Sequence, residues 1–337
     1  MVNILEMIDF EQIVGQKKSI QLLKALIKFD RIGHAYLFAG KEGIGKKITA
    51  IAFAKAINCT GLSENHNPCN HCSSCLKIEK GIHPDFRIIS PLNSIITIDQ
   101  IREIKSIIYW RPLESRKKIF LINDAHKMTI EASNSLLKIL EEPPEFAVLI
   151  LITAEPEIIL PTIISRCHRI SFQPLRVEEQ KEILTSMNLH LDNRHLEDIL
   201  LLSPGSPGKT IELASNLSKM KKKNRYIDWL IRTKPEQMVS NIFSSRDNEL
   251  TDIIESFLDF VEIMILWFRD ILFFKLGLAQ EMLCFPSRID TIKEFAQYYS
   301  QEKIILILDD LAEIPERIEK HINPKILLEN FIIRLGD

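Results

Sequence analysis

The sequence predicts an α/β domain followed by helical regions, and three observations lead to this prediction. Short apolar runs alternate with amphipathic helical segments as far as residue 172, which is typical of a parallel sheet covered by helices on both faces. A glycine-rich loop joins the first of these strands to the helix that follows it. Beyond residue 172 the strand pattern disappears and every segment reads as helical. The 337 residues, 46% of them hydrophobic, are enough for two or three domains.

The elements of the α/β domain follow from local patterns. Nearly unbroken apolar runs predict short buried strands over residues 35–40, 85–90, 117–124, 147–153 and 168–175. Helical spacing predicts helices over residues 46–57, 97–110 and 129–142. Thr97 or Asp99 begins the second of these helices, and Pro143 with Pro144 stops the third.

Three domains are expected from this division. The α/β domain covers residues 1–172, a small helical domain covers residues 173–214, and an all-α C-terminal domain covers residues 215–337. The lysine-rich run at residues 218–226 is interpreted as a solvated linker, with a DNA-contacting patch as the alternative. The apolar stretch at residues 257–274 carries four charged residues, so it is a buried helix and not a membrane span.

The net charge and the N-terminal sequence indicate which partners and which cell compartment to expect. Lys+Arg 43 against Asp+Glu 45 gives a net charge of -2, so no overall basic field attracts nucleic acid, and a DNA contact must be local or supplied by partners. The first 16 residues lack the basic and apolar regions of a signal peptide. We therefore expect a cytoplasmic protein without a membrane partner.

Residues 40–47 nearly match the phosphate-binding loop G-x-x-x-x-G-K-[ST]. Backbone N–H groups between Gly40 and Gly45, including that of Gly43, can surround phosphates, and Lys46 can reach the terminal ones. Lys47 stands where a hydroxyl would ligate Mg²⁺. The loop therefore keeps its shape and lacks one magnesium ligand.

The strand at residues 117–122 lacks the second magnesium ligand. Asn123 stands where an acid would hold the metal, and Asp124 follows it. Two altered ligands of one ion predict that ATP hydrolysis is absent or very weak, although Asp124 can still serve as a ligand. Whether ATP or ADP still binds the loop is left open.

Four cysteines, Cys59, Cys69, Cys72 and Cys75, have the spacing C-x9-C-x2-C-x2-C. In a cytosolic protein this spacing favours a tetrahedral Zn²⁺ site over disulfides, with an iron–sulfur cluster or unligated thiols as alternatives. No general base accompanies the cysteines, so a structural role is expected for an inserted module over about residues 59–75.

Several motifs together resemble the delta prime family of clamp-loader subunits of bacterial DNA polymerase III. The resemblance runs from near residue 10 to the end, and its motifs are IVGQ, HAYLFAG, the loop, the four-cysteine module, INDAHKMTIEASNSLLKILEEPP, LPTIISRC and NPKILLENFIIRLGD. It implies an AAA+ fold with a nucleotide-type domain, a helical lid and a C-terminal collar. It also implies a hetero-pentameric ring with gamma/tau and delta subunits, which loads the sliding clamp onto primer-template DNA within the polymerase holoenzyme.

The resemblance also assigns roles to single residues. Arg166, between Ser165 and Cys167, matches an arginine finger that enters the ATP site of an adjacent motor subunit, and a surface arginine paired with a carboxylate is the alternative. Thr153 matches a first sensor position or is an ordinary strand-end cap. No sensor role is assigned near Gly208 and Lys209.

The alternative within the family is a gamma/tau-type motor that hydrolyses ATP. Motor subunits keep the hydroxyl after the loop lysine and an acidic pair after the strand, whereas this chain has Lys47 and Asn123. The sequence therefore favours a stator subunit that contributes to the holoenzyme without catalysis of its own.

Overall fold

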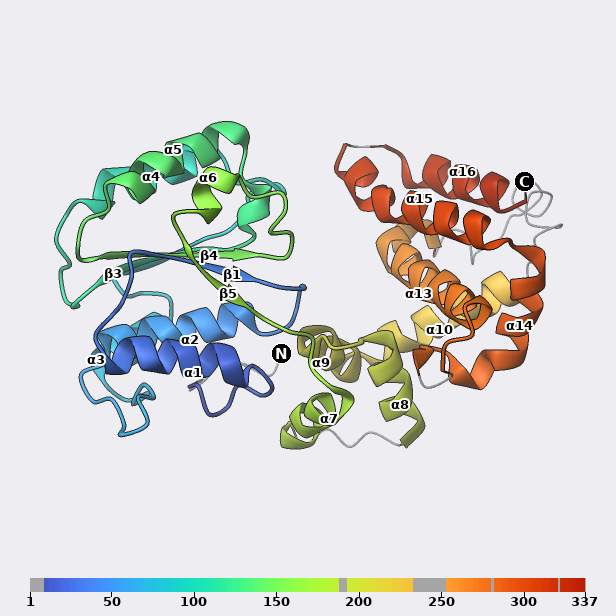
Figure 1. Ribbon diagram of the computed structural model, residues 1–337, viewed down its shortest axis with the longest axis horizontal. Coiled ribbons are helices and arrows are strands. Elements are labelled where there is room, and N and C mark those ends of the chain that lie inside the picture. The colour runs from blue at the N-terminus through green and yellow to red at the C-terminus, as the bar shows by residue number, and fades with distance from the viewer. Residues whose placement is uncertain (1–8, 188–192, 233–252, 280–281, 321, 337) are drawn as a thin grey trace. The chain divides into compact units, whose positions relative to one another are not determined.

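The computed structural model describes residues 9–187, 193–232, 253–279, 282–320 and 322–336 (Figure 1). The chain forms two compact units. The first unit comprises residues 1–189 and 205–211, and the second unit comprises residues 190–204 and 212–337.

A five-stranded parallel sheet is the centre of the first unit, as the sequence predicts. Its strands are β1 (Ala35–Ala39), β2 (Phe86–Ile89), β3 (Lys118–Ile122), β4 (Ala147–Thr153) and β5 (His168–Ser171), in the order β2-β3-β4-β1-β5. Ala39 is level with Thr153 of β4 and Ser171 of β5, so the carboxyl ends of these strands meet at one edge of the sheet. Every residue of β1, β3 and β4 is buried, which explains the unbroken apolar runs.

Helices cover both faces of this sheet (Figure 1). One face carries α1 (Lys17–Lys28), α2 (Lys46–Asn58) and α3 (Ser73–Glu79), and the other carries α4 (Ile98–Ile108), α5 (Ile130–Glu141) and α6 (Pro161–Ile164). Because successive strand residues point to opposite faces, Leu37 and Phe38 belong to separate hydrophobic cores. Thr97 caps α4 in a capping box with Gln100, and the Thr129 hydroxyl accepts a hydrogen bond at the start of α5.

The remaining described elements are helical. The first unit is completed by α7 (Val177–Ser186) and the beginning of α9 (Pro207–Ser215). The second unit contains α8 (Asn193–Leu202), α10 (Leu217–Arg232), α13 (Phe257–Lys275), the 3-10 turn η3 (Pro286–Arg288), α14 (Ile289–Tyr298), α15 (Gln301–Glu319) and α16 (Pro324–Gly336). No strand follows β5 in the described ranges.

The second unit is built around α13, which packs against α10, α14 and α15. Its side chains Phe260, Trp267 and Phe268 are fully buried, so the apolar stretch at residues 257–274 is a buried helix as expected. No helix in the described part of the chain is long and apolar enough to cross a membrane.

The linker expected at residues 218–226 is a wrong prediction, because these residues lie inside α10. Lysine has a high helix propensity, so a run of lysines does not by itself end a helix. The three-domain boundaries at residues 172 and 214 stay a prediction.

Candidate functional site

The glycine-rich loop lies between β1 and α2, at the edge of the sheet where the strands end. The Gly40 N–H donates to the Thr153 carbonyl at 3.3 Å, and Gly45 precedes α2 with a φ of +95°, a left-handed conformation that glycine adopts without strain. The buried Gln16 side chain donates from Nε2 to the Ile44 carbonyl at 3.2 Å. These contacts fix the loop to the end of β4 and to the segment that precedes α1.

Lys46 is turned back onto its own loop. Its Nζ donates to the carbonyl oxygens of Gly40 and Lys41, and the residue is only 6% exposed. Burial lowers the pKa of Lys46 to about 8, although the nearby Asp124 and Glu42 carboxylates act in the opposite direction. The ammonium that would reach a terminal phosphate is therefore engaged by the chain itself.

The start of α9 lies directly against the loop. The Gly208 N–H donates to the Gly43 carbonyl at 2.8 Å, and the Ser206 hydroxyl donates to the Glu42 carbonyl at 3.1 Å. The contact leaves no room for side chains: a Cβ on Gly43 would lie 2.4 Å from Ser206 Oγ, and one on Gly208 would lie 3.0 Å from the Gly43 Cα. Glycine is therefore strongly favoured at Gly43, which also has a φ of +72°, and a side chain at Gly208 would force the Gly43 backbone to shift.

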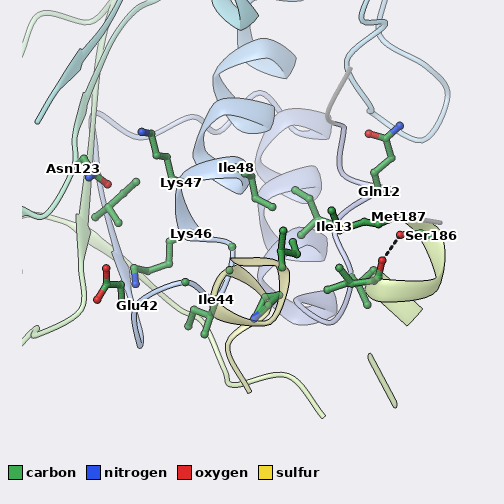
Figure 2. A pocket seen from close by; sticks show the side chains of 18 of the residues that line it. Gln12, Ile13, Glu42, Ile44, Lys46, Lys47, Ile48, Asn123, Ser186 and Met187 are labelled. Carbon is green, nitrogen blue, oxygen red and sulfur yellow. Dashed lines mark hydrogen bonds between the residues drawn. The ribbon is translucent and has the colours of Figure 1, made fainter. Parts of the chain in front are cut away.

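A cavity of about 490 Å³ opens beside the loop (Figure 2). Sequence reasoning did not find its apolar wall, because the wall combines residues that are far apart in the chain and individually resemble ordinary core. These wall residues are Ile13, Ile44, Ile48, Ile183, Met187 and Ile211. The volume and the mainly apolar lining suit the base and sugar of a nucleotide better than its phosphates.

Asn123 and Asp124 line the same cavity as Lys46 and Lys47. The Asn123 amide donates to the Asp124 carboxylate at 2.8 Å. The Lys47 side chain extends toward the strand end that carries Asn123 (Figure 2). An ammonium and an amide thus stand at the two positions where a phosphate-binding site needs a hydroxyl and an acid for Mg²⁺.

Thr153 is fully buried at the end of β4 and does not line the cavity, and neither does Gly40. The Thr153 hydroxyl lies 3.2 Å from His126 Nδ1 and accepts a hydrogen bond from the Glu155 N–H at 3.0 Å. These contacts match the interpretation of Thr153 as a strand-end cap, and the sensor role stays a prediction.

The four cysteines of the predicted module converge, with their sulfur atoms all within 4.8 Å of one another. Tetrahedral Zn²⁺ with Zn–S bonds of about 2.3 Å requires sulfur atoms about 3.8 Å apart, so this set fits a closed metal site. Backbone N–H groups also point at the sulfurs, as in the 3.3 Å contact from Cys69 N to Cys59 Sγ. Burial acts to raise the pKa of Cys72, but N–H donors from Cys75 and Thr60, together with hydrogen bonds from the Cys75 and Cys69 thiols, lower this pKa to about 6.

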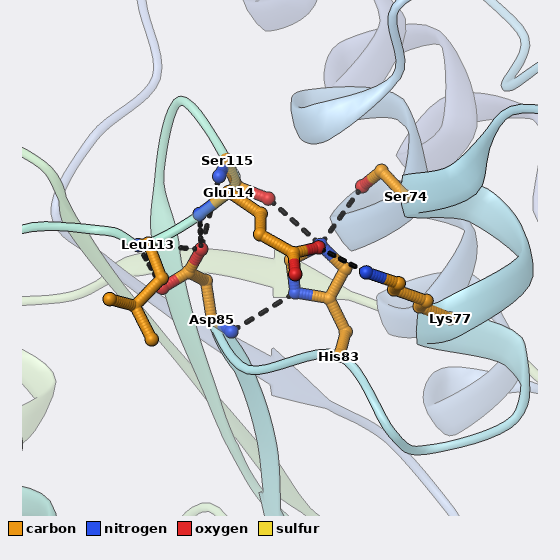
Figure 3. Close-up of polar contacts among 7 residues, drawn as sticks. All are labelled: Ser74, Lys77, His83, Asp85, Leu113, Glu114 and Ser115. Atoms are coloured by element: carbon orange, nitrogen blue, oxygen red, sulfur yellow. Dashed lines mark hydrogen bonds and ion pairs between the residues drawn. The ribbon is translucent and has the colours of Figure 1, made fainter.

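A buried polar cluster attaches this module to the sheet (Figure 3). His83 Nδ1 accepts from the Asp85 N–H at 3.0 Å, and its Nε2 lies 2.9 Å from Ser115 Oγ and 3.3 Å from Ser74 Oγ. The Asp85 carboxylate accepts from the N–H groups of residues 113–115 and is not hydrogen-bonded to the imidazole, so the cluster is not a catalytic triad. His83 is not part of the four-residue metal group.

Arg166 lies at the opposite edge of the sheet from the loop. It precedes β5, whose first residue, His168, is level with Tyr36 near the start of β1. Its guanidinium donates to the Thr162 carbonyl and to the Glu141 carboxylate, each at 3.0 Å. Burial raises the pKa of the neighbouring Cys167 thiol to about 12, so this cysteine is not a reactive thiolate.

Comparisons with known proteins agree with this architecture. A family described as "DNA polymerase III, delta subunit" matches residues 15–176, and its C-terminal counterpart matches residues 245–337. The chain is 30% identical to DNA polymerase III subunit delta' of Bacillus subtilis, over 96% of both chains. It is 29% identical to subunit tau of the same organism over 97% of this chain, although it spans only 61% of that protein.

A solved gamma subunit-related protein from Thermotoga maritima is 17% identical, with a TM-score of 0.49 over 94% of this chain and 98% of that one. This partial overlap says nothing about activity. The delta' relative is matched along nearly its whole length, and the parallel sheet with its phosphate-type loop is the α/β core of AAA+ proteins. The chain therefore belongs to the delta' family of DNA polymerase III clamp-loader subunits.

Proposed function

We propose that this chain is a stator subunit of the clamp loader, which helps to load the sliding clamp onto primed DNA and has little or no ATPase activity of its own. It assembles with gamma/tau and delta subunits into a five-membered ring. Within the ring it supplies Arg166 as an arginine finger to the ATP site of a neighbouring motor subunit.

The observation that carries this proposal is the separation of Arg166 from the chain's own loop. The finger lies at the amino edge of the sheet and the loop follows the carboxyl edge. The four residue steps of β1 alone span roughly 13 Å at about 3.3 Å each. Arg166 is therefore suited to a site on another subunit, where its planar fork would stabilise charge on the transferring phosphoryl group.

The chain's own loop supports the absence of turnover. Lys47 and Asn123 remove two ligands of the magnesium ion, and Lys46 is engaged by the loop carbonyls. The contact between Gly208 and Gly43 places the start of α9 against the loop, on the path by which a nucleotide would approach it. Binding of a nucleotide in the apolar cavity is compatible with this proposal, because binding does not require hydrolysis.

We also propose that Zn²⁺ occupies the four-cysteine site and has a structural role. The sulfur geometry and the N–H donors support a bound cation. Four cysteine ligands leave no open coordination position for catalysis, which supports the structural role. An iron–sulfur cluster is the competing occupant.

The alternative is a gamma/tau-type motor subunit. One observation favours it: no acceptor is found among the described residues for the backbone N–H groups of residues 43–47, so a phosphate cradle survives. A magnesium-dependent ATPase rate of the isolated chain that disappears in Lys46→Ala would establish the motor. We expect no turnover above background.

The finger is tested in the ring reconstituted from this chain and its partner subunits. Arg166→Ala should leave assembly and zinc content intact and lower clamp- and DNA-stimulated ATP hydrolysis. A finger is worth about 10³–10⁵ in rate at one site, but other ATP sites in the ring dilute that loss in the total. Arg166→Lys should rescue poorly because an ammonium cannot reproduce the fork.

The matched control is Arg169→Ala, which removes an exposed arginine from β5 itself. Wild-type hydrolysis and clamp loading with Arg166→Ala would remove the finger from the proposal. A ring that fails to assemble would identify Arg166 as an interface residue instead.

A further inference from the structure

Arg166 is held by its own chain on two sides. Its Nη1 donates to the Thr162 carbonyl at 3.0 Å, and its Nη2 donates to Glu141 Oε1 at 3.0 Å. The Ser165 hydroxyl adds a weak contact at 3.5 Å. The two charged side chains remain partly exposed, Arg166 at 36% and Glu141 at 51%.

The backbone beneath each partner is fixed. Glu141 is the last residue of α5, whose preceding residues Ile139 and Leu140 are buried in the core. Arg166 follows the short α6, and its N–H donates to the Ile163 carbonyl at 3.1 Å. The ion pair therefore joins two well-packed segments that are separated by 25 positions in the chain.

The geometry leaves the guanidinium able to receive a ligand. Arginine has five N–H donors, and the contacts to Thr162, Glu141 and Ser165 use at most three of them. A cavity of about 490 Å³ opens beside these groups, and its lining includes Arg166, Glu141, His34 and His168. The unused donors can form a second, outward contact without breaking the first.

We propose that Glu141 is a positioning residue for the arginine finger, an inference that rests on the proposed function. Its carboxylate fixes the orientation of the guanidinium before a neighbour's phosphate arrives. A side chain that is already ordered loses less rotamer freedom on binding, and it enters the phosphoryl site in the correct geometry. Charge-assisted pairing to a carboxylate favours this fixed orientation over the many rotamers of a free arginine.

The test compares Glu141→Gln with Glu142→Gln in the reconstituted ring. Glu142 is the next residue, is also exposed, and has no ion pair among the described residues, so it is a matched control. Partly exposed ion pairs are weak, so we expect Glu141→Gln to lower hydrolysis at the one affected site by about two- to five-fold. Pre-steady-state ATP hydrolysis resolves that site as a slower fraction of the burst.

The decisive measurement is the double variant Glu141→Gln with Arg166→Ala. If Glu141 acts through the arginine, the second substitution adds no further loss, whereas a general structural effect of Glu141 would add to it. The zinc content of each variant and its elution volume in size-exclusion chromatography serve as controls for folding and for assembly of the ring.

The outcomes separate this inference from the finger itself. Positioning is supported if one site is slow in both Glu141→Gln and Arg166→Ala. Glu142→Gln must then keep the wild-type rate, and the double variant must show no added loss. If Arg166→Ala slows the site while Glu141→Gln hydrolyses ATP at or above the wild-type rate, positioning is overturned and the finger remains. Arg166→Ala at the wild-type rate overturns the finger.

Discussion

Replacing Lys46 by methionine tests whether the fold bears a free-energy cost for the buried ammonium in its loop. A fall of the pKa from 10.5 to about 8 corresponds to roughly 3.4 kcal/mol, at 1.36 kcal/mol for each pH unit. The variant also loses two hydrogen bonds to the Gly40 and Lys41 carbonyls, worth about 1 kcal/mol each. We therefore expect Lys46→Met to be more stable than the wild type by about 1–2 kcal/mol at neutral pH.

The pH dependence of this stability difference is a second, independent test of the buried ammonium. The folded-state pKa of Lys46 lies below its unfolded value, so between about pH 8 and 10.5 the unfolded chain binds more protons than the folded chain. The stability that Lys46 contributes therefore rises with pH in this window. The advantage of Lys46→Met is complete below pH 8, falls by about 1.4 kcal/mol for each pH unit above pH 8, and is therefore lost near pH 9.

Urea denaturation followed by circular dichroism at pH 7.5 and 9.5 measures this difference. Hydrogen exchange of the buried β1 and β4 amides assigns the change to the first unit. Lys47→Met, which removes the exposed neighbouring lysine, should change stability by less than about 0.5 kcal/mol. A Lys46→Met protein that is less stable than the wild type at pH 7.5, or a stability difference that is equal at both pH values, would refute the reasoning.

Two further substitutions test the metal module and its attachment. The purified chain should contain about one Zn²⁺, and Cys72→Ser should reduce that content while the amides of β1 to β5 stay protected from hydrogen exchange. Bound iron, or an unchanged zinc content in the variant, would contradict the assignment. Asp85→Asn should destabilise the first unit by about 2–3 kcal/mol, because the fully buried carboxylate accepts from the N–H groups of residues 113–115, and wild-type urea stability would show that these contacts are dispensable.

Local chemistry explains why much of the fold could be predicted from the sequence. The strand at residues 147–153 is predicted with its observed bounds because all seven residues are buried and the first six are apolar. Thr97 and Thr129 begin helices as capping residues do. The run at residues 218–226 was misinterpreted because charge indicates exposure to water and does not distinguish a linker from the exposed surface of a helix.

The candidate site could be predicted only where its residues are close in sequence. The loop at residues 40–47 and the cysteine spacing are local patterns, so their residues were found directly. The contact of Gly208 with Gly43 spans more than 160 residues, and nothing near either glycine indicates it. The choice of Glu141 over Glu142 as the partner of Arg166 depends on the exact end of α5, which sequence patterns locate only within a few residues.

The contact between the loop and the start of α9 has a consequence for how motion passes through this subunit. In a nucleotide-driven machine, a helix beside the phosphate loop can report by its movement whether triphosphate or diphosphate is present. Here Gly208 and the preceding Ser206 bind the loop carbonyls directly, so the chain itself, and not a phosphate, joins the start of α9 to the loop. If the proposed function is correct, this subunit stays fixed while its neighbours move. A conformational change that passes from subunit to subunit around the ring would therefore end at this subunit.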